Sequence, residues 1–395
     1  MENIYFDNAA TTKVDDQVLQ IMLQYLSENY GNPSSVHSLG QDATQAVDHS
    51  REVISNHLGC APAEVIFTSC ATESNNLAIW GVLNSLIGRE GNFHFITTSI
   101  EHPSVMEIYK RIEKLGHEVT FLTVDDNGII NLEELKQAIK KNTVMVSVMF
   151  VNNEVGSIEP VSEVGEIVAI EKSNRESNDL PIYFHTDAVQ AMNYLPVKVE
   201  EIKCDFLSFS GHKIHAPKGI GVLYIRKGVK IEKLTYGGNQ EYGIRPGTLN
   251  VPSIVAIGEA IEILSKDQSK HFKNISKLRN LLIGELTKIS EVKVNGQSDH
   301  QSPHVLNISF LKAEGESILM MLDMEGISVS TGSACSSGAL EASPILRAMG
   351  VPVEWTHGSI RISLSRYSTQ EECKKLISSI TAIVDKLRKM APEIK

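Results

Sequence analysis

The chain has 395 residues, a length that suggests two or three domains. With 37 Lys or Arg and 48 Asp or Glu its net charge is −11, and this acidity argues against a nonspecific nucleic-acid binder. Five scattered cysteines without a Cys-x-x-Cys pair favour reduced thiols over a disulfide framework or a metal site. No apolar run approaches the roughly 18 residues of a membrane span and no signal-peptide pattern opens the chain, so we expect a soluble, cytoplasmic protein.

Short apolar runs alternate with amphipathic stretches through about the first 250 residues. The strand candidates in chain order are Glu64–Thr68, Phe93–Thr98, Glu118–Val124, Thr143–Val151, Pro181–His185, Asp205–Ser210 and Gly221–Arg226. Most are almost continuously apolar, as expected for strands covered on both faces. Helical spacing at Asn75–Leu86 and Leu132–Ile139 separates several of them. This alternation predicts an α/β fold with a mainly parallel, doubly wound sheet of seven strands.

The pattern changes after about residue 255. Helical stretches and strands then follow in the order helix Ile254–Leu264, helix Ser276–Ile289, strand Val305–Phe310, helix Glu314–Met324, strand Ser359–Leu364 and helix Thr369–Met390. Runs of helices with only a few strands predict a smaller α+β domain at the C-terminal end.

Ligands of a doubly wound sheet bind just outside the carboxyl ends of its strands. The residues that follow the predicted strands at these ends are small or polar: Ser69–Glu73, Glu101 and His102, Asn152–Glu154, Asp187 and Gln190, and Ser210–Lys213. We therefore expect one crevice to collect a helix start, a His, an Asn, an Asp, a Gln and a Lys.

Each member of this set also has an ordinary structural interpretation. Ala71 and Thr72 are compatible with a plain helix N-cap as well as with a phosphate held by free N–H groups. His102, which precedes a proline, is compatible with a simple helix start. Asp187 ends a buried apolar strand, where a carboxylate needs a donor or a cation. Lys213 is one of many lysines, but it directly follows a buried strand.

A lysine, an acid and a phosphate-binding helix start are together what pyridoxal phosphate (PLP) requires. The lysine forms a Schiff base with the cofactor, the acid pairs with the pyridinium nitrogen, and backbone N–H groups hold the phosphate. Lys213, Asp187 and the helix start at Ala71 and Thr72 supply this combination. The combination, rather than any single residue, predicts a PLP site.

The predicted second domain adds a cysteine and an arginine. Cys335 lies in the run 331–339, where all its neighbours are small and glycines stand three residues before and after it. A core cysteine is embedded among bulky apolar residues instead, so this pattern favours a reactive thiol. Arg361 lies inside an apolar strand, where it either pairs with an acid or binds a substrate carboxylate.

With these residues in view, nearly the whole chain resembles the class I cysteine desulfurases (NifS/IscS-like), which are PLP enzymes of fold type I. The motifs that carry the resemblance are YFDNAATT, YGNPSSVH, ATESNNLAI, EHPSV, VNNEVG, TDAVQA, SFSGHK, PKGIG, GGNQEYGIRPGT, GSACSSGAL and SIRISLSRY. It implies a large PLP-binding domain over residues 15–255 and a small domain, residues 1–14 and 256–395, that carries the catalytic cysteine loop. Cys70 departs from the family, which usually has glycine there.

The resemblance also implies a role for each candidate residue. Lys213 would carry the Schiff base and move the substrate's α-proton, and Cys335 would accept the sulfur. Arg361 would bind the substrate carboxylate, while Asn153 would orient cofactor and substrate. The other implied contacts are to the cofactor: Asp187 at the ring nitrogen, Gln190 at the ring hydroxyl, His102 stacked on the ring and available for acid–base steps, and Ala71, Thr72, Ser210, His212 and the neighbouring subunit's Thr248 around the phosphate.

These roles imply conversion of L-cysteine to L-alanine in a homodimer, with the sulfur carried on Cys335 as a persulfide for an acceptor protein. An iron–sulfur scaffold, a tRNA-thiolation protein and a DNA-phosphorothioation system all remain possible acceptors. No metal, membrane or direct nucleic-acid contact is expected. Two alternatives stay open: another PLP reaction on this scaffold, such as selenocysteine cleavage or transamination, and a PLP-binding protein that acts by docking partners. The cysteine loop disfavours a transaminase, and the complete set of candidate catalytic residues disfavours a docking protein.

Overall fold

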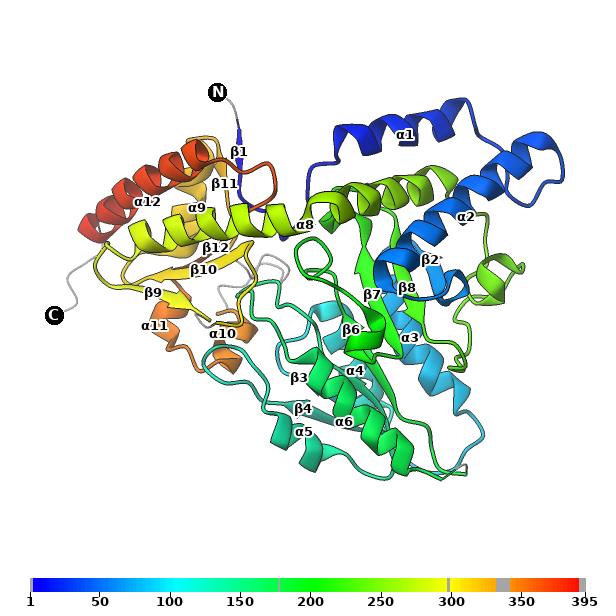
Figure 1. Cartoon of the computed structure of the whole chain (residues 1–395). Helices are drawn as coiled ribbons and strands as arrows, with labels where there is room; N and C mark the ends of the chain where they lie inside the picture. The colour runs from blue at the N-terminus through cyan, green and yellow to red at the C-terminus, as the bar shows by residue number, and fades with distance from the viewer. Residues whose placement is uncertain (1–2, 177, 297–298, 332–341, 391–395) are drawn as a thin grey trace.

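The computed structural model describes residues 3–176, 178–296, 299–331 and 342–390. Its largest sheet has seven strands in the order β2-β8-β7-β6-β5-β3-β4 (Figure 1). The bounds are β2 Val65–Thr68, β3 His94–Thr98, β4 Glu118–Leu122, β5 Thr143–Ser147, β6 Tyr183–Asp187, β7 Phe206–Ser210 and β8 Gly221–Ile225. Strands β7, β6, β5, β3 and β4 pair in parallel, whereas β8 is antiparallel to β2 and β7. The predicted mainly parallel α/β sheet is confirmed.

Helices cover both faces of this sheet because its strands are apolar on both sides. Along β2, Val65 and Phe67 belong to one hydrophobic core and Ile66 between them belongs to another. The first core includes residues of α1 (Asp16–Ser27), α2 (Ser38–Leu58), α5 (Leu132–Ala138), α6 (Val161–Asn174) and the start of α8 (Val251–Leu286). The second includes residues of α3 (Ala71–Ser85) and α4 (Pro103–Lys114).

Helix α8 corrects one sequence prediction. The two helices expected at 254–264 and 276–289 form a single helix of 36 residues, Val251–Leu286. Its first part packs on the core of the large sheet and its last part packs on a separate core. Residues 265–270 between these parts are exposed or half-buried. The helix continues there without an apolar stripe, which is why the apolar pattern breaks while the backbone does not.

A second, antiparallel sheet of three strands lies at the other end of α8 (Figure 1). Its order is β12-β10-β9, with β9 Val292–Asn295, β10 Val305–Phe310 and β12 Ser359–Ser363. Around it are α9 (Gly315–Met324), α10 (Pro344–Ala348), α11 (Val353–Thr356), α12 (Gln370–Met390) and the parallel pair of β1 (Ile4–Tyr5) with β11 (Ile327–Ser328). The strands and helices predicted between residues 305 and 390 agree with these bounds to within one residue.

The segment after β1 runs between the two sheets. Asp7 forms a parallel bridge with Ser363 at the end of β12. Five residues later, the N–H of Thr12 donates to the carbonyl of His212, just after β7, at 2.9 Å. Residues 7–12 therefore lie at the carboxyl edge of the large sheet, next to the small sheet. No helix in the described ranges is both long and apolar enough to cross a membrane.

Candidate active site

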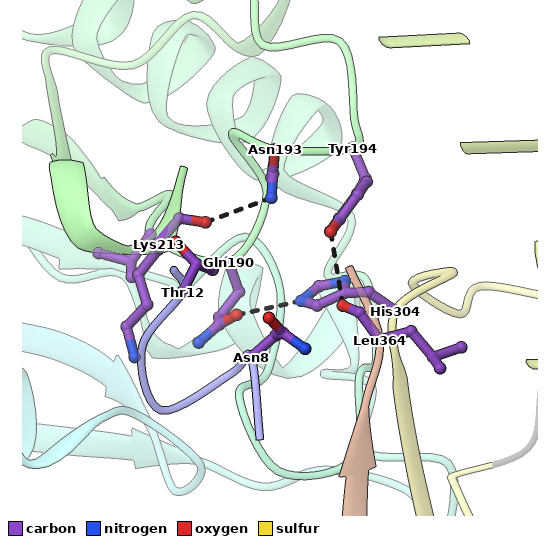
Figure 2. Close-up of a pocket in the computed structure, with 9 residues that line it drawn as sticks. Asn8, Thr12, Gln190, Asn193, Tyr194, Lys213, His304 and Leu364 are labelled. Carbon is purple, nitrogen blue, oxygen red and sulfur yellow. Dashed lines mark hydrogen bonds between the residues drawn. The ribbon is translucent and has the colours of Figure 1, made fainter. Parts of the chain in front are cut away.

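A pocket lies where the ends of β6 and β7 meet the N-terminal segment and the small sheet (Figure 2). Its lining residues are Asn8, Thr12, Val189, Gln190, Asn193, Tyr194, Lys213, His304 and Leu364. The sequence predicts two of them, Gln190 and Lys213, as site residues. The others come from segments far apart along the chain, which the fold brings to one edge of the sheet.

Lys213 ends the short 3-10 turn η2 (Gly211–Lys213), which directly follows β7. The turn requires glycine at its first position, because a Cβ on Gly211 would lie 2.7 Å from Ile220 Cγ2. The Lys213 Nζ donates to the carbonyl of Ala10 at 2.7 Å and also to that of Ala9. The N-terminal segment thus holds the lysine amine at the wall of the pocket.

Asp187 ends β6 and is 5% exposed. Its Oδ1 accepts from the N–H of Val189 at 3.0 Å, and its Oδ2 accepts from Asn75 Nδ2 at 2.9 Å. The same Asn75 amide donates to Ser104 Oγ at 2.9 Å. The buried carboxylate is therefore held in place by donors on both of its oxygens, as the sequence requires of an acid at this position.

His102 lies beside this acid and the lysine. It is the N-cap of α4, and its Nδ1 accepts from the N–H of Ser104 at 3.1 Å and lies 2.8 Å from Ser104 Oγ. Burial lowers the pKa of His102; the negative charge of Asp187 opposes this effect and the positive charge of Lys213 adds to it. The predicted helix start is confirmed, and the imidazole also lies within the fields of both charged groups.

The N-terminus of α3 faces this edge of the sheet and has no side-chain cap in the described structure. The N-cap is Cys70, so the interpretation of Ala71 as a cap is wrong: Ala71 is the first helical residue. Cys70 has φ −173°, an extended backbone open to any residue. The close approach is made by Gly221 instead, where a Cβ would lie 2.5 Å from the carbonyl carbon of Cys70. The first N–H groups of α3, at Ala71 and Thr72, are available to an anion.

Arg361 and Asn153 meet at the end of the small sheet. Arg361 Nη1 donates to the backbone carbonyl of Asn153 at 3.1 Å, and Nη2 pairs with Asp7 Oδ1 at 2.7 Å. The arginine side chain is only 5% exposed, and within the described residues its Nε has no acceptor. The side-chain Oδ1 of Asn153 is also buried and lacks a donor there. Of the two sequence interpretations of Arg361, the acid pair is present, and further N–H groups remain to bind a carboxylate.

The other predicted site residues are placed as follows. Ser210 ends β7, and its Oγ donates to the carbonyl of Ile220 at 3.4 Å. His212 Nδ1 lies 3.2 Å from Thr11 Oγ1, and burial lowers the pKa of His212 to about 4. Thr248 is exposed on the loop before α8 and does not line the pocket. Cys335 lies outside the described residues.

Sequence reasoning misses a polar layer beneath Asp187. His185 on β6 is fully buried, and burial lowers its pKa to about 3. Its Nε2 lies 3.1 Å from Asn75 Oδ1 and 3.2 Å from Ser208 Oγ. A histidine within an otherwise apolar strand, and an asparagine on the apolar side of a helix, were the available indications of this layer. No cluster of three or more His, Cys, Asp or Glu that could hold a metal occurs in the described ranges.

Comparison with known proteins identifies close relatives over nearly the full chain. Residues 4–376 match the family model described as Aminotransferase class-V. The chain is 44% identical over 390 residues to "Cysteine desulfurase IscS" of Dictyoglomus turgidum, covering 98% of this chain and 96% of that protein. A solved "NIFS-LIKE PROTEIN" is 38% identical, with a TM-score of 0.90 over 97% of this chain and all of the other. "SspA in complex with cysteine" is 33% identical, with a TM-score of 0.79 over 93% of this chain and 100% of that one.

Proposed function

The chain belongs to the class-V aminotransferase family and is similar to its cysteine desulfurases along nearly its whole length, and on this premise we propose that it is a PLP-dependent cysteine desulfurase. It converts L-cysteine to L-alanine and takes the sulfur onto Cys335 as a persulfide for delivery to an acceptor protein. We base this on the convergence of Lys213 and Asp187 at His102, whose imidazole both charges influence.

The residues at this edge of the sheet fit PLP. The amine of Lys213 lies at the pocket wall, and Asp187 is a buried acid oriented by two donors. The uncapped N-terminus of α3 offers N–H groups to a phosphate. The buried Oδ1 of Asn153, which has no donor among the described residues, is a polar atom that a ligand would satisfy.

In this proposal the cofactor is held from several sides. Asp187 would pair with the ring nitrogen, and Gln190 would donate to the ring hydroxyl oxygen. His102 would pack against the ring, and Asn153 would orient cofactor and substrate. The groups proposed around the phosphate are the N–H groups of Ala71 and Thr72, the side chains of Ser210 and His212, and the partner subunit's Thr248.

PLP, when bound, supplies a conjugated ring that accepts the electron pair released at the substrate's Cα. Lys213 Nζ takes the proton from Cα, which requires a neutral amine within reach of that carbon. Arg361 orients the substrate through its carboxylate, for which the unused N–H groups of its planar fork are suited. His102, whose pKa is lowered by burial, accepts or returns a proton at the substrate or product.

Cys335 performs the sulfur transfer. Its thiolate attacks the sulfur of the bound cysteine, a new S–S bond forms, and the Cβ–S bond of the substrate breaks. The electron pair of that bond stays with the substrate carbon, which takes up a proton and becomes the methyl group of alanine. The sulfur leaves later, when a thiol of the acceptor or an added reductant attacks the persulfide.

Purified protein supplied with PLP, L-cysteine and dithiothreitol tests this proposal. We expect equal amounts of sulfide and alanine from the unmodified chain. Cys335→Ala should bind PLP normally and release no sulfide. Cys373→Ala is the matched control, since that thiol is fully buried in the small core and should not affect either product. Sulfide production by the Cys335 variant at the unmodified rate, or a chain that binds no PLP, would refute the proposed function.

A further inference from the structure

His304 is a buried histidine that occupies the side of the pocket nearest the small sheet (Figure 2). It immediately precedes β10, and its ring lies 4.7 Å from the Tyr194 ring, centre to centre. Its Nε2 is 3.1 Å from Gln190 Oε1, and its Nδ1 is 2.5 Å from Ser302 Oγ. Both ring nitrogens are therefore engaged, one of them by a residue proposed to contact the cofactor.

The backbone carbonyl of Ala9 determines how the protons are arranged along this chain of contacts. A carbonyl oxygen can only accept, so the group of Gln190 that lies 3.0 Å from it must be the Nε2 amide. The Gln190 Oε1 then faces His304 and accepts from its Nε2–H. Because a neutral imidazole has one N–H, Nδ1 is the acceptor and Ser302 Oγ donates to it.

The charge state of His304 agrees with this arrangement. Burial lowers the pKa of His304 to about 3, and the positive charges of Arg361, Lys213 and Arg279 act in the same direction. The ring packed against Tyr194 is therefore neutral across the pH range in which an enzyme of this kind is assayed. A neutral ring with its proton on Nε2 is the form that donates to Gln190.

The Ala9 carbonyl also accepts from the amine of Lys213, so the amide nitrogen of Gln190 lies on the side of that amine. We propose that His304 is a positioning residue that locks the Gln190 amide in this orientation, with its remaining N–H directed at the ring hydroxyl oxygen of PLP. This inference rests on the proposed function. In the reversed orientation the amide would present its own carbonyl oxygen to a negatively charged ring oxygen, and one attractive contact would become repulsive.

The proposed role of His304 can be tested without measuring turnover. Cofactor-free protein is titrated with PLP, and the visible absorbance of the bound cofactor is then followed as a function of pH. His304→Phe keeps an aromatic ring against Tyr194 but has no donor. We expect it to weaken PLP binding about tenfold, as for one lost hydrogen bond to a charged oxygen. The midpoint of the absorbance titration should also rise by about one pH unit, because a ring oxygen without its donor favours a proton on the neighbouring nitrogen of the Lys213 linkage.

Two further variants separate donation from packing. His304→Gln can donate through its own amide and should restore both the affinity and the midpoint. Tyr194→Phe alters the packing around His304 and removes the hydroxyl contact with the Leu364 carbonyl, but leaves Gln190 untouched, so its midpoint should stay that of the unmodified protein. If His304→Phe does not fold, Ser302→Ala replaces it, since it frees the proton to move to Nδ1 and should shift the midpoint in the same direction.

The outcomes distinguish the two proposals. Failure of the unmodified protein to develop a visible PLP band overturns the proposed function, and the present inference with it. The role of His304 is overturned, and the proposed function is not, if the unmodified protein shows a normal band while the midpoint and the PLP affinity of His304→Phe are unchanged. The same holds for Ser302→Ala if that variant is used. Equal shifts in His304→Phe and His304→Gln also overturn it, because they would show that the donor is irrelevant.

Discussion

Replacement of Arg361 by lysine is the change that most directly examines how the substrate is held. The guanidinium uses one N–H on the Asn153 carbonyl and another on Asp7, which leaves N–H groups on Nε and on both terminal nitrogens. Lysine keeps the positive charge but presents a single ammonium group, which cannot satisfy Asp7, Asn153 and a two-pronged carboxylate at once. The loss should therefore fall on substrate binding.

The expected size follows from the hydrogen bonds. One hydrogen bond to a charged group is worth about 1.5–3 kcal/mol, so losing the second prong should raise KM for L-cysteine by about 10- to 150-fold. Arg366→Lys is the matched control. Arg366 pairs with Asp15 at 2.6 Å and its side chain is also 5% exposed, but it does not line the pocket. It should cost stability while KM stays within about twofold of the original.

Steady-state alanine production over a range of L-cysteine concentrations measures both variants, with bound PLP quantified in the same samples. A KM for Arg361→Lys within about twofold of the unmodified protein, at full PLP occupancy, would refute the assignment of the substrate carboxylate to this arginine. Equal KM changes in the two variants would refute it as well, because they would reflect the loss of a buried ion pair and nothing specific to the site.

Lys213→Ala should lose the visible band of the lysine-linked cofactor and lower alanine production by about 10²- to 10⁴-fold; an unchanged band would assign the linkage to another residue. Asn75→Ala removes the side-chain donor to Asp187 Oδ2 and should lower the free energy of unfolding in urea by about 1–3 kcal/mol while weakening PLP binding; PLP affinity equal to that of the unmodified protein would contradict a link to the cofactor. Burial raises the pKa of Glu154 from 4.5 to about 7, although the hydrogen bond from Ser343 acts in the opposite direction. The stability contributed by this carboxyl group is therefore complete below about pH 4.5 and is lost as the pH rises through about 7. Glu154→Gln should remove that decline, about 3 kcal/mol, from urea unfolding measured across this range, and an unaltered pH profile would contradict it.

The elements that sequence predicts well are those whose burial is uniform along their length. Every residue of β2, β3, β5, β6, β7 and β8 is buried, so most of these strands are visible in the sequence as largely apolar runs; only β4, at the edge of the sheet, is exposed or half-buried over most of its length. Lys213 and Asp187 could be placed for the same reason, since each directly follows such a run and the ends of parallel strands meet at one edge. Their approach to His102 follows from the topology of the sheet, and the charges of both groups influence the pKa of its imidazole.

Contacts between distant segments could not be predicted, because they depend on the three-dimensional path of the chain. Asp7 and Arg361 are 354 positions apart, and no local pattern pairs them. The hydrogen bond between His304 and Gln190 joins residues 114 positions apart, and it forms because the small sheet lies next to the carboxyl edge of the large one. The prediction of two helices in place of α8 was wrong for a different reason. The exposed middle of α8 lacks the apolar stripe by which amphipathic helices are recognised.

In the proposed reaction the carbon chemistry occurs at Lys213 while the sulfur moves to Cys335. To test this, the PLP-loaded protein is reacted with one equivalent of L-cysteine without a reductant. Peptide mass spectrometry then locates the sulfur, and the alanine formed is quantified. We predict one alanine for each added sulfur atom, with that sulfur on the peptide that contains Cys335. Alanine formed with the sulfur on Cys70, or released with none on Cys335, would contradict this division of roles between Lys213 and Cys335.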